Sequence, residues 1–237
     1  MFIMNKFSII IPTFNEIDNI EILIKKIFIV LKKYIFEIIV VDDNSKDGTK
    51  KILKKLKLNN KRFNYFIRKN LNRDLSKSII LGVSKTKYEN IVVMDGDLQH
   101  NPDYLPKICQ IFSRNDLDFL VCSRNFKKRY GLSFTRFYSS KFLILMINFL
   151  LGKKISDPMS GFFIFKKNFF KSNKDYIYGN GFKILMSLIY STKRKLNIYE
   201  QKIIFKNRFN NKSKMNFIVL FHIIISLIYY FILRLKR

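Results

Sequence analysis

Cysteine is almost absent from the sequence, because only Cys109 and Cys122 occur among 237 residues. Two cysteines build no disulfide framework and no CxxC pair is present, so a disulfide-stapled domain is excluded and a reducing compartment is expected. Glycine and proline are also scarce, with 8 and 4 residues, and neither a Gly/Ser/Pro-rich linker nor an internal repeat divides the chain. No signal-peptide pattern precedes the first strand pattern. The length and composition fit one α/β domain of ordinary upper size.

Acidic residues are few, with 17 Asp and Glu against 45 Lys and Arg, and the formal net charge is +28. Such an excess favours a polyanionic partner: a nucleic acid, an anionic membrane surface or a phosphorylated substrate. Compositional bias is the alternative, since Lys, Ile, Asn and Phe are all heavily used. A basic nucleic-acid-binding protein is the non-enzyme alternative. However, the Lys-rich segments are spread along the chain without a zinc, RNP or helix-turn-helix signature, so we expect no nucleic-acid partner.

Short apolar runs alternate with segments of helical spacing. Strands are predicted at residues 7–11, 37–41, 63–67, 91–94, 119–122, 161–166 and 197–205. Helices are predicted at residues 20–31, capped by Asp18, and at 49–58, 76–84, 102–112, 137–151, 181–190 and 217–233. This alternation indicates βαβ units, so we expect a Rossmann-like, mostly parallel central sheet flanked by helices.

Polar clusters follow three of the predicted strands: residues 13–16, residues 42–43 and residues 95–99. Parallel neighbouring strands would bring these clusters to one edge of the sheet, where open α/β sheets bind ligands. The chain has neither GxGxxG nor GxxxxGK[ST], which excludes a dinucleotide Rossmann site and a P-loop. A nucleotidyltransferase is also disfavoured, because residues 11–19 contain neither glycine nor a cation.

The segment 91–102 is the most informative stretch of the chain. Its apolar strand runs into Asp95 and Asp97, which are separated only by Gly96, and Gln99 follows. Oxygen ligands of this kind suit Mg²⁺ or Mn²⁺, which are held by one or two carboxylates together with substrate phosphates. The alternative is that both carboxylates only cap the next helix. We assign Asp95, Asp97 and Gln99 as metal ligands.

Six motifs in order resemble family 2 glycosyltransferases with the GT-A fold, and among them the dolichyl-phosphate (polyprenyl-phosphate) mannosyltransferases. They are FSIIIPTFNE (7–16), EIIVVDDNSKDGT (37–49), VVMDGDLQHNP (92–102), CSR (122–124), DPMSGFF (157–163) and FKNRFNNKSK (205–214). The resemblance covers roughly residues 7–215. It implies a GT-A domain over residues 1–215, followed by a C-terminal apolar helix over residues 216–237.

The resemblance also implies roles for single side chains. Contacts with the base and ribose are implied for Pro12, Phe14, Glu16, Val41 and Asp43. Contacts with the metal and the donor diphosphate are implied for Asp95, Asp97 and Gln99. Contacts with the nucleotide sugar are implied for Gly96, and for Arg208 and Lys214 on a late loop that folds over the donor diphosphate. Catalytic roles are implied for Asp97, Arg124 and Arg136, with both arginines near the donor and the acceptor phosphate. Phe14 stands where the family usually has Tyr, so stacking is kept and a hydroxyl contact is lost.

The implied reaction is inverting transfer of a sugar, mannose from GDP-mannose, to dolichyl or undecaprenyl phosphate. The nearest rival donor is UDP-glucose, and another family 2 transferase activity is also open. A phosphate acceptor needs no general base, since its second pKa is about 6. It needs cations instead, and Arg124 and Arg136 are the candidates, unless they are only surface charges. Asp157 either lies beside the acceptor or only begins a turn.

Residues 217–233 carry no charge and are followed by Arg234, Lys236 and Arg237. As a helix they would span about 25 Å, slightly less than the roughly 30 Å of a hydrocarbon core. We expect a membrane-associated helix that lies in the plane rather than spanning, with the catalytic domain on the cytoplasmic side. A tail helix packed on the protein or on a partner chain is the alternative. The oligomeric state is left open.

Overall fold

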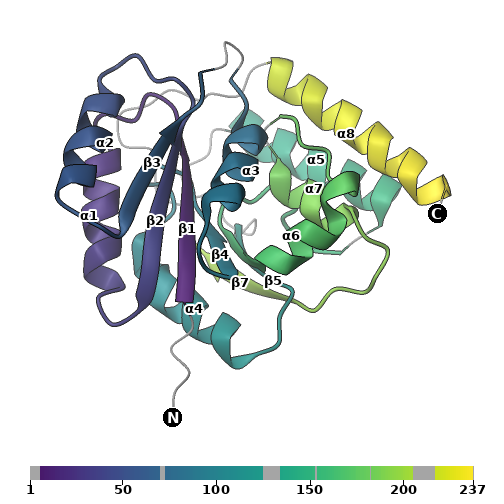
Figure 1. Ribbon diagram of the computed structural model, residues 1–237. Helices are drawn as coiled ribbons and strands as arrows, with labels where there is room; N and C mark the ends of the chain where they lie inside the picture. The colour runs from purple at the N-terminus through teal and green to yellow at the C-terminus, as the bar shows by residue number, and fades with distance from the viewer. Residues whose placement is uncertain are drawn as a thin grey trace.

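The computed structural model describes residues 6–69, 73–124, 134–152, 154–181, 183–204 and 217–236. A mixed sheet of seven strands forms its centre, in the order β3-β2-β1-β4-β6-β5-β7 (Figure 1). The strands are β1 (Lys6–Thr13), β2 (Ile35–Asp42), β3 (Phe63–Ile67), β4 (Asn90–Val93), β5 (Phe119–Arg124), β6 (Phe163–Lys166) and β7 (Ile198–Ile203). Only β6 runs antiparallel to its neighbours, β4 and β5. The sheet is therefore mostly parallel, as the sequence predicts.

Helices cover both faces of the sheet. They are α1 (Ile20–Val30), α2 (Thr49–Leu58), α3 (Leu75–Lys85), α4 (Leu105–Arg114), α5 (Phe134–Leu151), α6 (Lys167–Asn173), α7 (Ile184–Tyr190) and α8 (Phe217–Lys236), with short 3-10 turns at Pro102–Tyr104 and Lys174–Tyr176. Alternate residues of β1 point to opposite faces, because side chains alternate along a strand. Ile9 and Ile11 join the core beneath α1, α2 and α4, whereas Ile10 joins the core beneath α3, α5, α7 and α8.

Most predicted elements are confirmed, and α2 and β3 have the predicted bounds. Three local predictions were wrong or incomplete. The N-cap residue of α1 is Asn19 and not Asp18. The antiparallel direction of β6 was not predicted, and neither was α6, which follows β6 without a break.

Helix α8 packs alongside α5, on the side of the molecule away from α1 and α2 (Figure 1). Its inner face buries Ile223, Leu227 and Tyr230 in the same core as α5 and α7. Its outer face exposes Phe221, Ile224, Ile228, Ile232 and Leu235. A search of the described residues finds no helix with both the length and the apolar character needed to cross a membrane.

Candidate active site

The carboxyl ends of β1, β2 and β4 lie side by side, because β1 pairs in parallel with both other strands. Beyond the strands the pairing continues: the Asp43 N–H donates to the Thr13 carbonyl at 2.8 Å, and the Met94 N–H donates to the Ile10 carbonyl at 3.1 Å. The three polar clusters that follow these strands therefore meet at one edge of the sheet. This confirms the convergence expected from the sequence.

The loops after β1 and β2 are joined by hydrogen bonds between backbone and side chain. The Asn15 N–H donates to Ser45 Oγ at 2.8 Å, and the Glu16 N–H donates to Thr49 Oγ1 at 3.0 Å. Asn15 has a positive φ of 52°, a conformation that Asn adopts more readily than most residues. Glu16 is buried, and its Oε2 accepts a bond of 2.7 Å from Asn19 Nδ2. The Glu16 carboxylate is thus held in a defined position at the sheet edge.

Asp43 forms a buried ion pair that the sequence did not reveal. Its Oδ1 lies 2.6 Å from Arg68 Nη1, and its Oδ2 accepts the Asp74 N–H at 2.6 Å. Burial raises the pKa of Asp43, while the Asp74 N–H and the Arg68 charge act in the lowering direction. The carboxylate therefore fixes both Arg68 and the start of α3 beside the end of β2.

The loop after β4 contains the two carboxylates of the proposed metal site. Asp97 and Gln99 are buried, and the Gln99 N–H donates to Asp97 Oδ1 at 3.2 Å. Leu98, between them, has a positive φ of 59°. A Cβ on Gly96 would lie 3.4 Å from Thr13 Oγ1 and 3.7 Å from Glu16 Cγ, so this loop packs directly against the loop after β1.

The Asp95 side chain is 35% exposed and lies between His100 and Gly161. The Asp95 N–H donates to His100 Nδ1 at 3.1 Å, so this ring nitrogen acts as the acceptor. His100 Nε2 is 3.8 Å from Asp95 Oδ2, and its ring stacks on Phe162. On another side is Gly161, where a Cβ would come within 2.6 Å of Asp95 Oδ2. The absence of a side chain at Gly161 leaves the space in which this carboxylate lies.

Arg124, the last residue of β5, is held by the fully buried Asp157. Arg124 Nε is 2.7 Å from Asp157 Oδ2, and Nη2 is 2.8 Å from Oδ1, so the pair is bidentate. Burial acts to lower the pKa of Arg124, but the Asp157 carboxylate and then Asp95 raise it above its ordinary value. The pKa of Asp157 is lowered, because the Arg124 charge and hydrogen bonds outweigh the burial that acts to raise it. Asp157 therefore does more than begin a turn.

Comparison with known proteins identifies the family to which this arrangement belongs. The model of glycosyl transferase family 2 matches residues 8–173. The chain belongs to glycosyl transferase family 2. It is 35% identical to the dolichol-phosphate mannosyltransferase of Pyrococcus furiosus, over 89% of this chain and 59% of that protein. It is 31% identical to that of Saccharomyces cerevisiae, over 78% of this chain and 70% of the yeast protein. The chain thus spans less than two thirds of the length of the Pyrococcus protein.

Solved structures show the same architecture. Glucosyl-3-phosphoglycerate synthase from Mycobacterium tuberculosis, in complex with Mn²⁺, UDP-glucose and phosphoglyceric acid, matches with a TM-score of 0.73 and 15% identity, over 96% of this chain and 80% of that one. The same enzyme in complex with UDP matches with a TM-score of 0.72 and 16% identity, over 96% of this chain and 80% of that one. At this identity the likeness concerns the fold alone, which is GT-A-like.

The donor atoms at the sheet edge of this family 2 transferase suit a hard divalent cation. Asp95 and Asp97 supply carboxylate oxygens and Gln99 an amide oxygen, the ligand types that Mg²⁺ and Mn²⁺ take. Within the described residues no group of three or more His, Cys, Asp or Glu side chains could hold a metal. Two carboxylates are nevertheless the usual number where substrate phosphates and water complete the shell. By the chemistry of its donors, the site fits Mg²⁺ or Mn²⁺.

The remaining predicted residues are placed as follows. Pro12 and Val41 are cross-strand partners near the ends of β1 and β2. Phe14 follows β1, and the guanidinium of Arg73 lies 4.7 Å from its ring centroid. Arg136 lies in the first turn of α5, with its side chain outside the described part. Arg208 and Lys214 lie outside the described residues.

Three cations near this edge were not found from the sequence. Arg68 pairs with Asp43, Arg73 lies over Phe14, and Lys183 Nζ donates to the Met159 carbonyl at 3.2 Å, beside Asp157. Of these three, only Arg68 could have been predicted from the sequence. It directly follows β3, and β3 pairs with β2, the strand that ends at Asp42. Arg73 and Lys183 come from loops whose paths depend on tertiary packing.

Proposed function

We propose that this family 2 glycosyltransferase moves mannose from GDP-mannose to a polyprenyl phosphate, dolichyl or undecaprenyl phosphate, at a membrane surface. One observation carries the proposal: the carboxylates of Asp95 and Asp97 lie at the sheet edge together with a partly buried Arg124 that is paired with the buried Asp157. This sheet edge therefore offers carboxylates for a metal bound to the donor diphosphate, and a cation for the acceptor phosphate. Similarity to two dolichol-phosphate mannosyltransferases over most of the chain supports this choice of donor and acceptor.

The donor would bind across the ends of β1 and β2. Pro12, Phe14, Glu16, Val41 and Asp43 are proposed to surround the base and ribose. The Arg73 guanidinium lies over the Phe14 ring. Both groups are flat and can stack on a planar ring, which supports a base at this position. The diphosphate would then reach the loop of Asp95, Gly96, Asp97 and Gln99. Arg208 and Lys214 are proposed to close over it.

A divalent cation bound by Asp95, Asp97 and Gln99 would neutralise the charge that develops on the departing diphosphate. Arg124 is proposed to hold the acceptor phosphate, together with Arg136. Asp157 fixes the direction of the Arg124 guanidinium through two of its nitrogen atoms. Arg is suited to this role, because a guanidinium recognises phosphate oxygens through two parallel N–H donors.

The acceptor is its own nucleophile. A phosphate monoester has a second pKa of about 6 and is largely dianionic at neutral pH, so no side chain has to remove a proton. One phosphate oxygen would attack the anomeric carbon, while the bond from that carbon to the diphosphate breaks and the nucleoside diphosphate leaves with its electron pair. Attack from the opposite side would invert the anomeric centre. An α-linked donor would then give a β-linked lipid product.

A transfer assay tests the proposal. The purified chain would be given polyprenyl phosphate, Mn²⁺ or Mg²⁺, and either labelled GDP-mannose or labelled UDP-glucose. We expect label in the lipid fraction with GDP-mannose. If only UDP-glucose labels the lipid, the donor is UDP-glucose and not GDP-mannose. If neither donor labels the lipid, the proposal is overturned.

The membrane part of the proposal rests on two exposed apolar stripes. Helix α5 exposes Tyr138, Phe142, Leu145 and Phe149, and α8 exposes Phe221, Ile224, Ile228, Ile232 and Leu235. The spacing of three or four residues places each set on one side of its helix. An amphipathic helix of this kind can lie in the interface plane. We propose that α5 and α8 contact the cytoplasmic surface of a membrane that carries the acceptor.

A further inference from the structure

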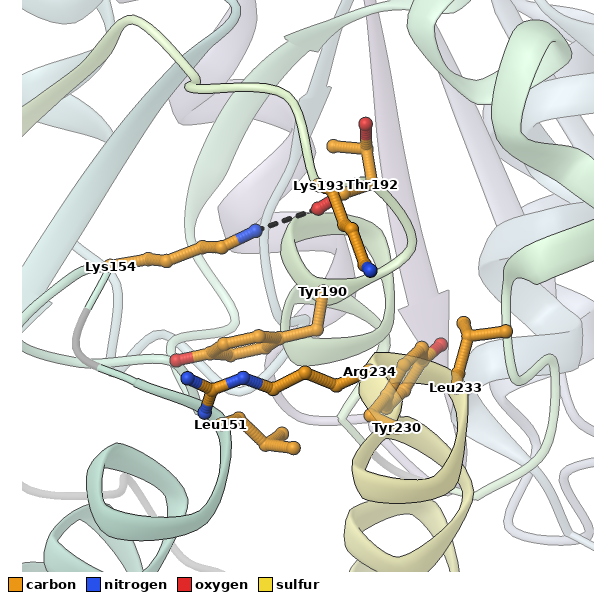
Figure 2. A pocket seen from close by; sticks show the side chains of 8 residues that line it. All are labelled: Leu151, Lys154, Tyr190, Thr192, Lys193, Tyr230, Leu233 and Arg234. Carbon is orange, nitrogen blue, oxygen red and sulfur yellow. Dashed lines mark hydrogen bonds between the residues drawn. The ribbon is translucent and has the colours of Figure 1, made fainter. Parts of the chain in front are cut away.

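A pocket of about 390 Å³ lies where the carboxyl ends of α5, α7 and α8 meet (Figure 2). Its volume falls within the range of small-ligand pockets. It lies far from the proposed acceptor site, because Arg136 and Leu151 stand at opposite ends of α5. Fifteen residues of helix separate them by about 22 Å. The pocket therefore lies outside the proposed catalytic site.

Three cations reach this pocket from three segments. Lys154 comes from the chain after α5, Lys193 from the chain after α7, and Arg234 from the last turn of α8 (Figure 2). The described residues that line the pocket include no carboxylate. Like charges are thus gathered around the pocket without an acidic partner among its described lining residues.

Two of these cations are anchored by backbone carbonyl groups. Lys154 Nζ donates to the carbonyls of Ile189 at 3.1 Å and Thr192 at 2.8 Å, and Arg234 Nη1 donates to that of Leu150 at 3.0 Å. The ordinary explanation is that they cap helix ends. A helix carboxyl end supplies about −0.5 of a charge, so three ends offset at most about half of three positive charges. Burial and then Arg234 lower the pKa of Lys154, as expected for a cation that lacks a full counter-charge.

The rest of the wall is aromatic and apolar. Tyr190 donates its hydroxyl to the Gly152 carbonyl at 2.8 Å, and the Tyr230 hydroxyl accepts the Tyr178 N–H at 2.7 Å. Leu151 and Leu233 complete this side. With both hydroxyl groups engaged by the backbone, the tyrosine rings offer a fixed apolar surface beside the cations. This combination suits an anion that is attached to a less polar body.

We propose that the pocket is a second anion-binding site, which takes a phosphate group through Lys154, Lys193 and Arg234. The phosphate could belong to a lipid headgroup or be free in solution, and both share this chemistry. The outer face of α8 is apolar as far as Leu235, one residue beyond Arg234, which places the pocket beside the surface proposed to meet the membrane.

The test compares Lys193→Ala with Lys195→Ala in the full chain. Both lysines are exposed and lie two residues apart, but only Lys193 lines the pocket, so the change in charge is matched. Binding would be measured by co-sedimentation with phosphatidylcholine vesicles that contain or lack phosphatidylglycerol. A parallel arm would measure the rise in melting temperature caused by inorganic phosphate.

For a lipid phosphate, we expect Lys193→Ala to weaken binding to phosphatidylglycerol vesicles about fivefold, with a smaller loss in Lys195→Ala. For free phosphate, we expect phosphate to raise the melting temperature of the wild type and of Lys195→Ala but not of Lys193→Ala. Equal behaviour of the two variants in both arms, including no effect in either, would overturn the site.

Discussion

At the scale of single residues, the candidate site depends on contacts that hold charged groups in place. Asp95 lies against Gly161 and beside His100, and Arg124 forms an ion pair with Asp157. The sequence allowed Asp95 and Arg124 to be predicted, because each stands at the end of a recognisable strand pattern. The positions of Gly161 and Asp157 relative to them could not be predicted, since both come from a loop after α5 that packs back on β5.

Gly161→Ala tests whether the position of Asp95 matters for metal binding. The added Cβ would lie 2.6 Å from Asp95 Oδ2, so the carboxylate must move. We expect Mn²⁺ affinity, measured by electron paramagnetic resonance, to fall about tenfold or more. Gly96→Ala is the comparison: its Cβ would approach no atom closer than 3.4 Å, and we expect a much smaller change. Unchanged Mn²⁺ affinity in a folded Gly161→Ala protein would contradict the assignment of Asp95 as a ligand.

Asp157→Asn tests the buried ion pair. The variant leaves the Arg124 charge, which is 15% exposed, without its partner. Breaking a fully buried pair in this way costs about 3–5 kcal/mol in the free energy of unfolding, and we expect a loss at the lower end of that range. Urea unfolding at neutral pH would measure it. Asp116→Asn removes an ion pair with Lys166 in which Asp116 is 94% exposed, and we expect a far smaller effect. Equal stability of the Asp157→Asn and wild-type proteins would show that the pair does not hold the loop.

The same pair predicts a dependence on pH. The folded-state pKa of Asp157 is below its ordinary value, so the stability it contributes is complete above the unfolded-state pKa of about 4. That stability is lost as the pH falls through the lower, folded-state pKa. We expect the difference in unfolding free energy between wild type and Asp157→Asn to stay constant near neutrality and to shrink below about pH 4. A difference that grows on acidification would refute this.

At the scale of elements, the sequence predicted what local patterns determine. The bounds of α2 follow from local chemistry: Gly48 has a φ of 100° at the N-cap, and Asp47 Oδ1 accepts the Thr49 N–H. The direction of β6 is a long-range property, because the strand is defined by pairing with β4 and β5. Helix α6 is only seven residues long and carries no periodic signal. Its position is determined by Phe169 and Phe170, whose side chains pack into the core.

Helix α8 gives an element-scale prediction about the proposed membrane surface. Ile228 is 54% exposed on its outer face, so Ile228→Gln removes apolar contact without disturbing the core. We expect sedimentation with vesicles to weaken about tenfold, with an unchanged melting temperature. Ile29→Gln, at a 69% exposed position on α1, should leave vesicle binding unaltered. If both variants bind vesicles as the wild type does, α8 is not a membrane-contacting element.

At the scale of the whole molecule, the order of the strands creates the candidate site. Because β1 lies between β2 and β4, three polar clusters separated by up to about eighty residues in the chain meet at one edge. Alternation of strands and helices made this convergence predictable. The cations that surround it were less predictable, since Arg73 and Lys183 reach the edge only through packing of the loops around α3 and α7. The net charge of +28 indicated anionic partners without showing where they bind.

The central claim is that the carboxylates after β4 support sugar transfer to a lipid phosphate by holding a divalent cation. Its most direct test is the rate of transfer from labelled GDP-mannose to polyprenyl phosphate, measured against Mn²⁺ concentration in wild type and in Asp97→Ala. We predict saturable Mn²⁺ dependence in the wild type, and no transfer by an Asp97→Ala protein that unfolds at the wild-type temperature. Metal-independent transfer, or full turnover by Asp97→Ala, would contradict the account.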